Sequence, residues 1–174
     1  MLVVIAIIMI LAAILLPAAS TARQNARKRE AKSFITALGN SLKAYEAEYG
    51  TLPMNDDGTV PAAILVPAQL RQFHSIMIGS NVSMDGTVGR NPRNRVFLHF
   101  KDATVAVASN WYDPWKRWYQ IQFDDNADNQ ITVFTSAGAP QIRGRFAIWS
   151  QGPDQTNNLA SMGSPLNKDN ITSW

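Results

Sequence analysis

Residues 1–50, "MLVVIAIIMILAAILLPAASTARQNARKREAKSFITALGNSLKAYEAEYG", decide the fold class of this chain. No charged residue occurs before Arg23. Further along, apolar residues recur at three- and four-residue intervals with charged residues between them, which is the pattern of one helix face. We therefore predict a single helix from Met1 to about Tyr49, on the order of 70 Å long. Gly50 is typical of the residue that ends a helix.

The two halves of this predicted helix need different surroundings. Residues 1–22 are apolar on every side, and roughly 20 such residues match the ~30 Å hydrocarbon core of a bilayer. Residues 23–50 are amphipathic and suit packing on a globular domain formed by residues 51–174. A cleaved signal peptide is the alternative, but no basic residue precedes the run, and the run exceeds the usual ~7–15 apolar residues.

Pro17 interrupts the apolar half of the predicted helix. Proline removes one backbone hydrogen bond and clashes with the preceding turn, so we expect a kink or a locally melted turn there. In a subunit that leaves a membrane and packs into a fibre, such a weak point would let the helix extend or bend.

Composition limits the remaining possibilities. The 174 residues suit one domain plus an appendage, and 46% hydrophobic with 17% charged residues argues for a packed core and against disorder. The chain has no cysteine, which excludes disulfides and thiolate chemistry. The net charge of +3 is modest.

The rest of the chain is β-rich. We predict strands in five segments rich in β-branched and aromatic residues, 95–100, 104–109, 118–123, 131–136 and 144–150. Residues 124–130, "DDNADNQ", predict a hairpin tip, and a short helix is expected from near Pro67. The fold class is therefore α+β: a long helix packed on a three- or four-stranded antiparallel sheet, ending in a C-terminal loop.

The opening segment resembles that of type IV pilins and type II secretion pseudopilins, and Pro17 falls where that family has its helix-breaking proline. "FITALGNSLKAYEAEYGTLP" is similar to the family's helix end. "YDPWKRWYQIQF" resembles the Asp-Pro-Trp-Gly…Tyr signature of major pseudopilins, and the resemblance continues in "IWSQGPD" and "ITSW". The chain is most similar to the major-pseudopilin-like branch, with the pilin fold.

The beginning of the chain, the placement of its basic residues and the residue at position 116 depart from that family. Its mature proteins carry a phenylalanine and a glutamate ahead of the apolar run, so we expect Met1 not to be the natural beginning. By the positive-inside rule, Arg23 and the basic residues after it would place the side of the apolar run on which they lie in the cytoplasm. The family instead keeps its C-terminal domain outside. Lys116 stands where the family's motif has glycine.

The resemblance implies a structural subunit of a type IV pilus-like helical filament, not an enzyme. Its partners would be copies of itself, the inner membrane before assembly, and the pilus or secretion assembly machinery. It would end in a cell-surface pilus or, alternatively, in the periplasmic pseudopilus as a major pseudopilin. A membrane-anchored minor pilin or adhesin is a third possibility. The residues expected to pack in the filament core are Leu2, Ile7, Leu11, Ile14 and Leu15.

Calcium is the one cofactor that the sequence suggests. The polar C-terminal stretch offers hard oxygen ligands in Asp154, Asp169 and Asn170, which suit Ca²⁺. Major pseudopilins bind calcium in this region, and Asp154 matches one of their acidic positions. The alternative is a loop held by packing of Trp174 and by side-chain hydrogen bonds.

Other candidate sites favour structural roles. Asp124, Asn126 and Asp128 have EF-hand spacing, but the later glycine and glutamate of such a loop are missing. His74 and His99 have no metal-ligand spacing around them, although Asp102 lies close to His99 in the sequence. We expect both histidines to be structural.

The aromatic and basic cluster at residues 111–118 resembles a surface that stacks single-stranded nucleic acid. A core face with a solvated edge explains the same pattern. We do not expect nucleic acid to be a partner.

Overall fold

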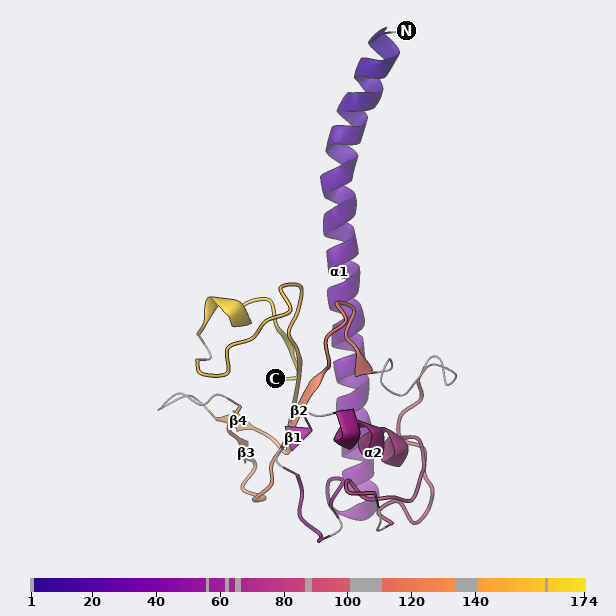
Figure 1. Cartoon of the computed structure of the whole chain (residues 1–174), viewed down its shortest axis with the longest axis vertical. Helices are drawn as coiled ribbons and strands as arrows, with labels where there is room; N and C mark the ends of the chain where they lie inside the picture. Colours follow the sequence, from indigo (N-terminus) through magenta and orange to yellow (C-terminus); the bar gives the residue numbers. More distant parts are fainter. Residues whose placement is uncertain are drawn as a thin grey trace.

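A long N-terminal helix stands on a small α+β domain in the computed structural model (Figure 1). The structure describes residues 2–55, 57–61, 63–64, 67–86, 89–100, 111–133, 141–161 and 163–174. Within these ranges, some side chains in elements are not described: Leu2, Ile5, Ala6, Ile8, Ile10, Ala12, Ile14, Leu15, Leu16, Ala63, Ile64, Pro67 and Ala68.

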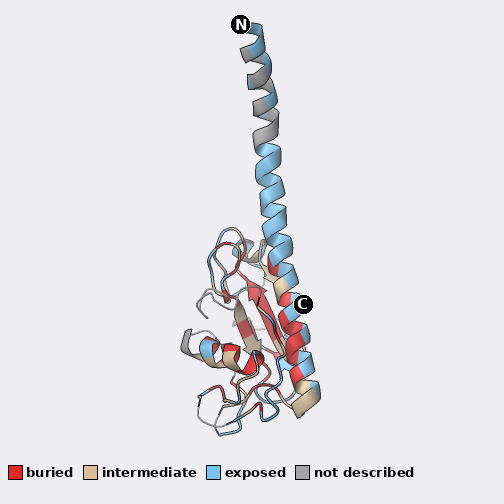
Figure 2. Cartoon of the chain, turned by 90° about the vertical axis from the view of Figure 1, so that its right-hand side faces the viewer, coloured by how far each residue is buried: buried red, intermediate tan, exposed pale blue. Residues whose placement is uncertain are grey.

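The helix α1, Leu2–Tyr49, confirms the predicted single element. It ends as expected at Gly50, whose φ of 76° is left-handed and whose N–H bonds to the carbonyl of Glu46 at 2.7 Å. Only its C-terminal part packs on the domain, and Figure 2 shows the buried stripe there. Five side chains at helical spacing form this stripe: Ala31, Ile35, Leu38, Leu42 and Tyr45.

The sheet that faces α1 has four strands in the order β1-β2-β5-β6, all antiparallel. The strands are β1 (Ala63–Ile64), β2 (Gln120–Phe123), β5 (Phe146–Ser150) and β6 (Ile171–Thr172). A second, two-stranded sheet joins β3 (Gln130–Ile131) to β4 (Ile142–Arg143). The helix α2 (Pro67–Met77) begins where expected, and the short 3₁₀ helix η2 (Pro165–Asn167) lies in the C-terminal stretch. The coarse prediction of fold class and sheet size is therefore confirmed.

The predicted hairpin is wrong. The strand β2 pairs with β5, in the register Gln122 to Ala147, whereas β3 pairs with β4 in the other sheet. Left-handed φ angles of 61° at both Ala127 and Asn129 turn the chain, so the polar loop leads from β2 into the separate two-stranded sheet.

The predicted strand at residues 95–100 is also wrong. The N–H groups of Phe97 and Leu98 both bond to the carbonyl of Met77 at the end of α2, and the hydroxyl of Ser41 donates to the Phe97 carbonyl. These partners leave the segment without a sheet ladder. The prediction at residues 104–109 lies outside the described residues.

The last two differences concern shorter pieces. Of the strand predicted at 131–136, the structure has β3 at Gln130–Ile131, and residues 134–136 lie outside the described part. The C-terminal loop is not wholly irregular, because β6 within it pairs Thr172 with Trp149 of β5.

Candidate functional site

The most unusual surface is the N-terminal part of α1, which projects beyond the domain (Figures 1 and 2). Its described apolar side chains are between 52% and 72% exposed: Val3, Val4, Ile7, Met9 and Leu11. Ile7 and Leu11 are two of the residues expected in a filament core. The side chains of Leu2, Ile14 and Leu15, the other three, lie outside those that the structure describes.

A membrane span was expected in residues 1–22. Across the part of the chain that the structure describes, no helix is both long and apolar enough to cross a membrane.

Pro17 lies inside α1, which continues through it. Figure 1 shows the N-terminal part of the helix leaning away from the axis of the remainder. The hydroxyls of Ser20 and Thr21 donate to the carbonyl of Pro17 at 2.8 and 3.1 Å. Hydroxyl bonds of this kind to a carbonyl three or four residues earlier tend to bend a helix.

The Asp-Pro-Trp turn at residues 113–117 is built around the buried carboxylate of Asp113. Its Oδ1 accepts the backbone N–H groups of Trp115 and Arg117, both at 2.9 Å. Its Oδ2 accepts the hydroxyl of Ser150 at 2.6 Å, which ties the turn to the end of β5. The turn and the end of β5 are thus bonded to each other.

Lys116 occupies a left-handed position in this turn, with a φ of 71°. Glycine adopts that conformation without a steric penalty, whereas a residue with a Cβ does not. Lys116 is therefore held in a backbone conformation that favours glycine.

The turn also reaches α1 at a residue that sequence reasoning missed. The indole N–H of Trp115 donates to Oε1 of Gln24 at 3.2 Å. The two residues are 91 positions apart, and a lone glutamine on a helix carries no sequence signal for such a contact. Trp111 and Trp115 are both buried, which confirms the core interpretation of these two rings.

The two histidines differ. His74 is buried, stacks on Phe100 at 4.5 Å, and accepts the indole N–H of Trp111 at its Nδ1. Burial lowers the pKa of His74, so the neutral ring is favoured. His99 is exposed and lines a surface groove of about 530 Å³ beside α1. Its segment forms no strand, so its predicted place within a strand is wrong. Asp102 lies outside the described residues.

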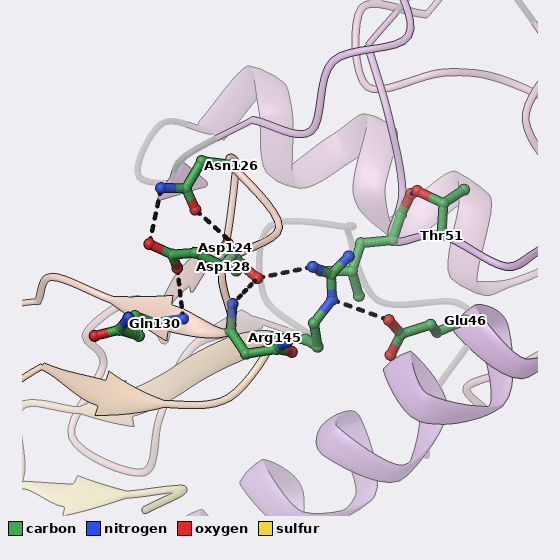
Figure 3. Close-up of polar contacts among 9 residues, drawn as sticks. Glu46, Thr51, Asp124, Asn126, Asp128, Gln130 and Arg145 are labelled. Carbon is green, nitrogen blue, oxygen red and sulfur yellow. Dashed lines mark hydrogen bonds and ion pairs between the residues drawn. The ribbon is translucent and has the colours of Figure 1, made fainter.

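The loop with EF-hand-like spacing is held by an ion-pair network (Figure 3). Arg145 lies between Asp124 and Glu46, with distances of 2.7 and 3.1 Å to their carboxylate oxygens. Burial would raise the pKa of Asp124, but the N–H groups of Asn129 and Asp128 and the Arg145 guanidinium together hold it below its ordinary value. The Asp124 carboxylate is therefore engaged in closing the turn and in joining it to α1.

The candidate calcium ligands lie in the C-terminal loop. The N–H of Asp154 donates to Oδ2 of Asp169 at 3.0 Å, so these two residues meet. Asn170 follows directly, and its buried Oδ1 has no hydrogen-bond partner in the part of the chain that the structure describes. Gly152 approaches closely as well, since an added Cβ would lie 2.3 Å from the Asp169 carbonyl oxygen.

The alternative account of this loop also has support. The side chain of Asn167 bonds to the backbone of Asn158 and Ser161, so hydrogen bonds join the two sides of the loop. The rings of Trp149 and Trp174 meet edge to face at 6.0 Å. Asn167 is a residue that sequence reasoning missed, because nothing distinguishes it from the other asparagines of the stretch.

Over the described ranges, no three His, Cys, Asp or Glu side chains gather into a group that could hold a metal ion. The candidate set differs from such a group, since it combines two carboxylates with an amide oxygen. No family model matches this chain, and the comparisons with curated proteins and with solved structures find no match.

Proposed function

We propose that this chain is a structural subunit of a type IV pilus-like helical filament. The apolar halves of α1 from many copies would form the core, and the β-rich domains would form the surface. The observation that carries the proposal is the exposed apolar segment of α1, in which the described side chains of Val3, Val4, Ile7, Met9 and Leu11 are between 52% and 72% exposed.

Energetics support the same arrangement. Burying an aliphatic side chain stabilises by roughly 1.5–3 kcal/mol, so several such side chains per copy provide a strong driving force for association. Identical helices that pack through different faces form an open helical assembly when the rotation between neighbours does not close into a ring. Before assembly, the same apolar surface would be kept in the inner membrane.

The decisive test replaces one exposed leucine at a time with lysine. Leu11→Lys places a charge in the proposed core and is expected to abolish filaments seen by electron microscopy of material sheared from cells. Leu166→Lys is the matched control, because Leu166 is similarly exposed, at 46% against 54%, but lies on the domain. The control is expected to assemble normally.

Normal filaments from Leu11→Lys would rule out the proposed core. Near-ultraviolet circular dichroism of both variants separates assembly from folding, since Leu11 lies outside the domain core and the domain signal should be unchanged. Loss of filaments from both variants would also contradict the proposal, because it would show no special role for α1.

A periplasmic major pseudopilin is the second candidate. It is favoured by the turn built on Asp113 and its bond to Ser150, which join two motifs of that branch. The location of the filament distinguishes the two. Fibres recovered from the cell surface indicate a pilus, whereas protein that stays in the inner membrane and periplasm indicates the secretion pseudopilus.

We further propose that the C-terminal loop binds Ca²⁺ through Asp154, Asp169 and Asn170. The donor atoms are hard oxygens, as calcium prefers, and the Oδ1 of Asn170 is a buried acceptor that receives no hydrogen bond from the described residues. The ion would supply positive charge between the two carboxylates. The protein would supply the close approach of Gly152 to the backbone of Asp169, which brings Asp154 and Asp169 together.

Metal removal tests this site in the full chain held in detergent. We expect EDTA to lower the Tm of the domain and excess Ca²⁺ to restore it, because a ligand that binds only the folded state stabilises by about 2.7 kcal/mol at 100 times its Kd. Asp169→Asn should remove the calcium dependence, and Asp125→Asn, at an exposed carboxylate in another loop, should keep it. Equal melting curves in EDTA and Ca²⁺ would exclude the site.

A further inference from the structure

Four positive side chains lie on α1 between the apolar segment and the domain. This basic collar consists of Arg23, Arg27, Lys28 and Arg29, all of them exposed. Among the described residues, none of the four takes part in an ion pair. The nearest acidic residue in the chain is Glu30, and none precedes it.

The collar surrounds the helix instead of marking one face. At about 100° per residue, its members point roughly 0°, 40°, 140° and 240° around the axis. They extend along about 9 Å of helix, which is similar to the thickness of one headgroup layer of a bilayer, roughly 5–8 Å. A face that binds one protein neighbour would need charges on one side only.

The domain adds two further cations at the same level. The bond from Trp115 to Gln24 places the turn at residues 113–117 beside the collar. Lys116 and Arg117 in that turn are exposed, and the one acidic side chain of the turn, Asp113, is buried and bonded to Ser150. Lys32 differs, because its Nζ donates to the carbonyl of Thr172 at 2.6 Å and so holds β6 on α1.

We propose that the basic collar, with Lys116 and Arg117, binds the phosphate groups of anionic phospholipids while the apolar segment before it lies among the acyl chains. This inference rests on the proposed function, which places α1 in a membrane before assembly. Arginine and lysine side chains near an anionic membrane surface each contribute to binding, and guanidinium groups bond well to phosphate. The collar would set the depth of the helix and hold the domain at the surface.

Nucleic acid is the other polyanion that could meet these cations. Binding of single-stranded nucleic acid relies on bases that stack on accessible aromatic rings. The rings of Trp111 and Trp115 are buried, at 0% and 6% exposure, and cannot offer such a platform. The more exposed rings of Tyr112 and Trp118 pack on each other, with centroids 4.4 Å apart, and the collar itself contains no aromatic residue. The collar also continues directly from the apolar segment, which a lipid partner explains and a nucleic-acid partner does not.

The test measures how the full-length chain distributes between two vesicle populations that can be separated by density. One contains phosphatidylcholine only, and the other also contains about 30% phosphatidylglycerol. Insertion of the apolar segment contributes equally to both, so the ratio reports the charge effect alone. The collar variant is R23Q/R27Q/K28Q/R29Q. The control, K43Q/R71Q/R143Q/K168Q, removes the same charge from four other exposed side chains.

We expect the wild type and the control to favour the anionic vesicles by roughly five-fold per collar cation, up to several hundred-fold. The collar variant should distribute almost evenly, and about 1 M salt should remove the wild-type preference. An even distribution of the wild type, or equal ratios for the collar variant and the control, would overturn the proposal. An even wild-type distribution together with collar-dependent binding of single-stranded DNA would overturn it in favour of nucleic acid.

Failure of this inference and failure of the proposed function give different results. Filaments from a wild type that shows no preference for anionic vesicles would refute the collar alone. A chain with the lipid preference but without filaments would refute the filament proposal.

Discussion

The two ends of α1 carry similar side chains in very different surroundings. In the C-terminal half, the five apolar side chains of the buried stripe are at most 1% exposed, because the sheet and α2 cover them: Ala31, Ile35, Leu38, Leu42 and Tyr45. In the N-terminal half, Leu11 and its described apolar neighbours are more than half exposed. A contiguous apolar surface of this kind marks a site of interaction with another molecule. The comparison teaches that one continuous helix can be packed in a core over one half and leave its apolar side chains exposed over the other.

The largest expected difference between the halves comes from truncating a leucine in each. Leu38→Ala should lower the free energy of unfolding by about 3 kcal/mol, since Leu38 is fully buried and its loss leaves a cavity. Leu11→Ala should leave it unchanged within about 0.5 kcal/mol. Urea unfolding of the full chain in detergent, followed by tryptophan fluorescence, measures both. Equal losses would break the comparison.

The boundary between the halves depends on the turn that touches Gln24. Asp113→Ala leaves two backbone N–H groups and the Ser150 hydroxyl without their acceptor, so we expect a loss of about 2–3 kcal/mol. Asp113→Asn keeps one acceptor oxygen and should cost about 1 kcal/mol. The same unfolding assay separates them, and a harmless Asp113→Ala would show that the turn does not need the carboxylate.

The domain that covers the C-terminal half of α1 should also respond to pH through His74, which packs on Phe100 and Trp111. Because burial lowers its pKa in the folded state, the unfolded chain binds protons more readily. The stability from His74 is therefore complete above 6.5, the ordinary value, and decreases as the pH falls below 6.5 towards the lowered folded-state pKa. Urea midpoints measured between about pH 5 and pH 8 for wild type and His74→Gln test this. A variant with an unchanged slope would contradict it.

The smallest expected effect concerns Lys116 in the boundary turn. Lys116→Gly relieves the left-handed strain and should raise the free energy of unfolding by about 0.5–1 kcal/mol. Arg117→Gly, next to it, is the control and should not stabilise. If both variants lower the free energy of unfolding, the left-handed conformation of Lys116 does not destabilise the domain and the prediction is wrong.

Sequence reasoning succeeded where the signal was local. The bounds of α1, the start of α2 near Pro67 and the strand β5 all follow from periodicity and from terminating residues. It failed where a distant partner decided the outcome. Residues 95–100 have strand composition, yet their backbone bonds to Met77 of α2 and to Ser41 of α1.

The candidate sites divide in the same way. Residue types alone placed Asp154 and Asp169 in one polar loop, and the structure brings them into contact. The pairing of Asp124 with Arg145 was not predictable, because the residues are 21 positions apart and every acidic residue of that loop has a similar sequence context. The contact of Gln24 with Trp115 was not predictable for the same reason, since the two residues are 91 positions apart.

The sequence by itself determined the long helix, its division into an apolar and an amphipathic half, and the α+β class, because these depend on periodicity and composition within a short stretch. Only the tertiary structure decided which strands pair, that the Asp113 turn reaches Gln24, and that the basic collar stands at the upper edge of the domain. Such contacts join residues far apart in the chain. They depend on which surfaces are left to pack once each element has formed.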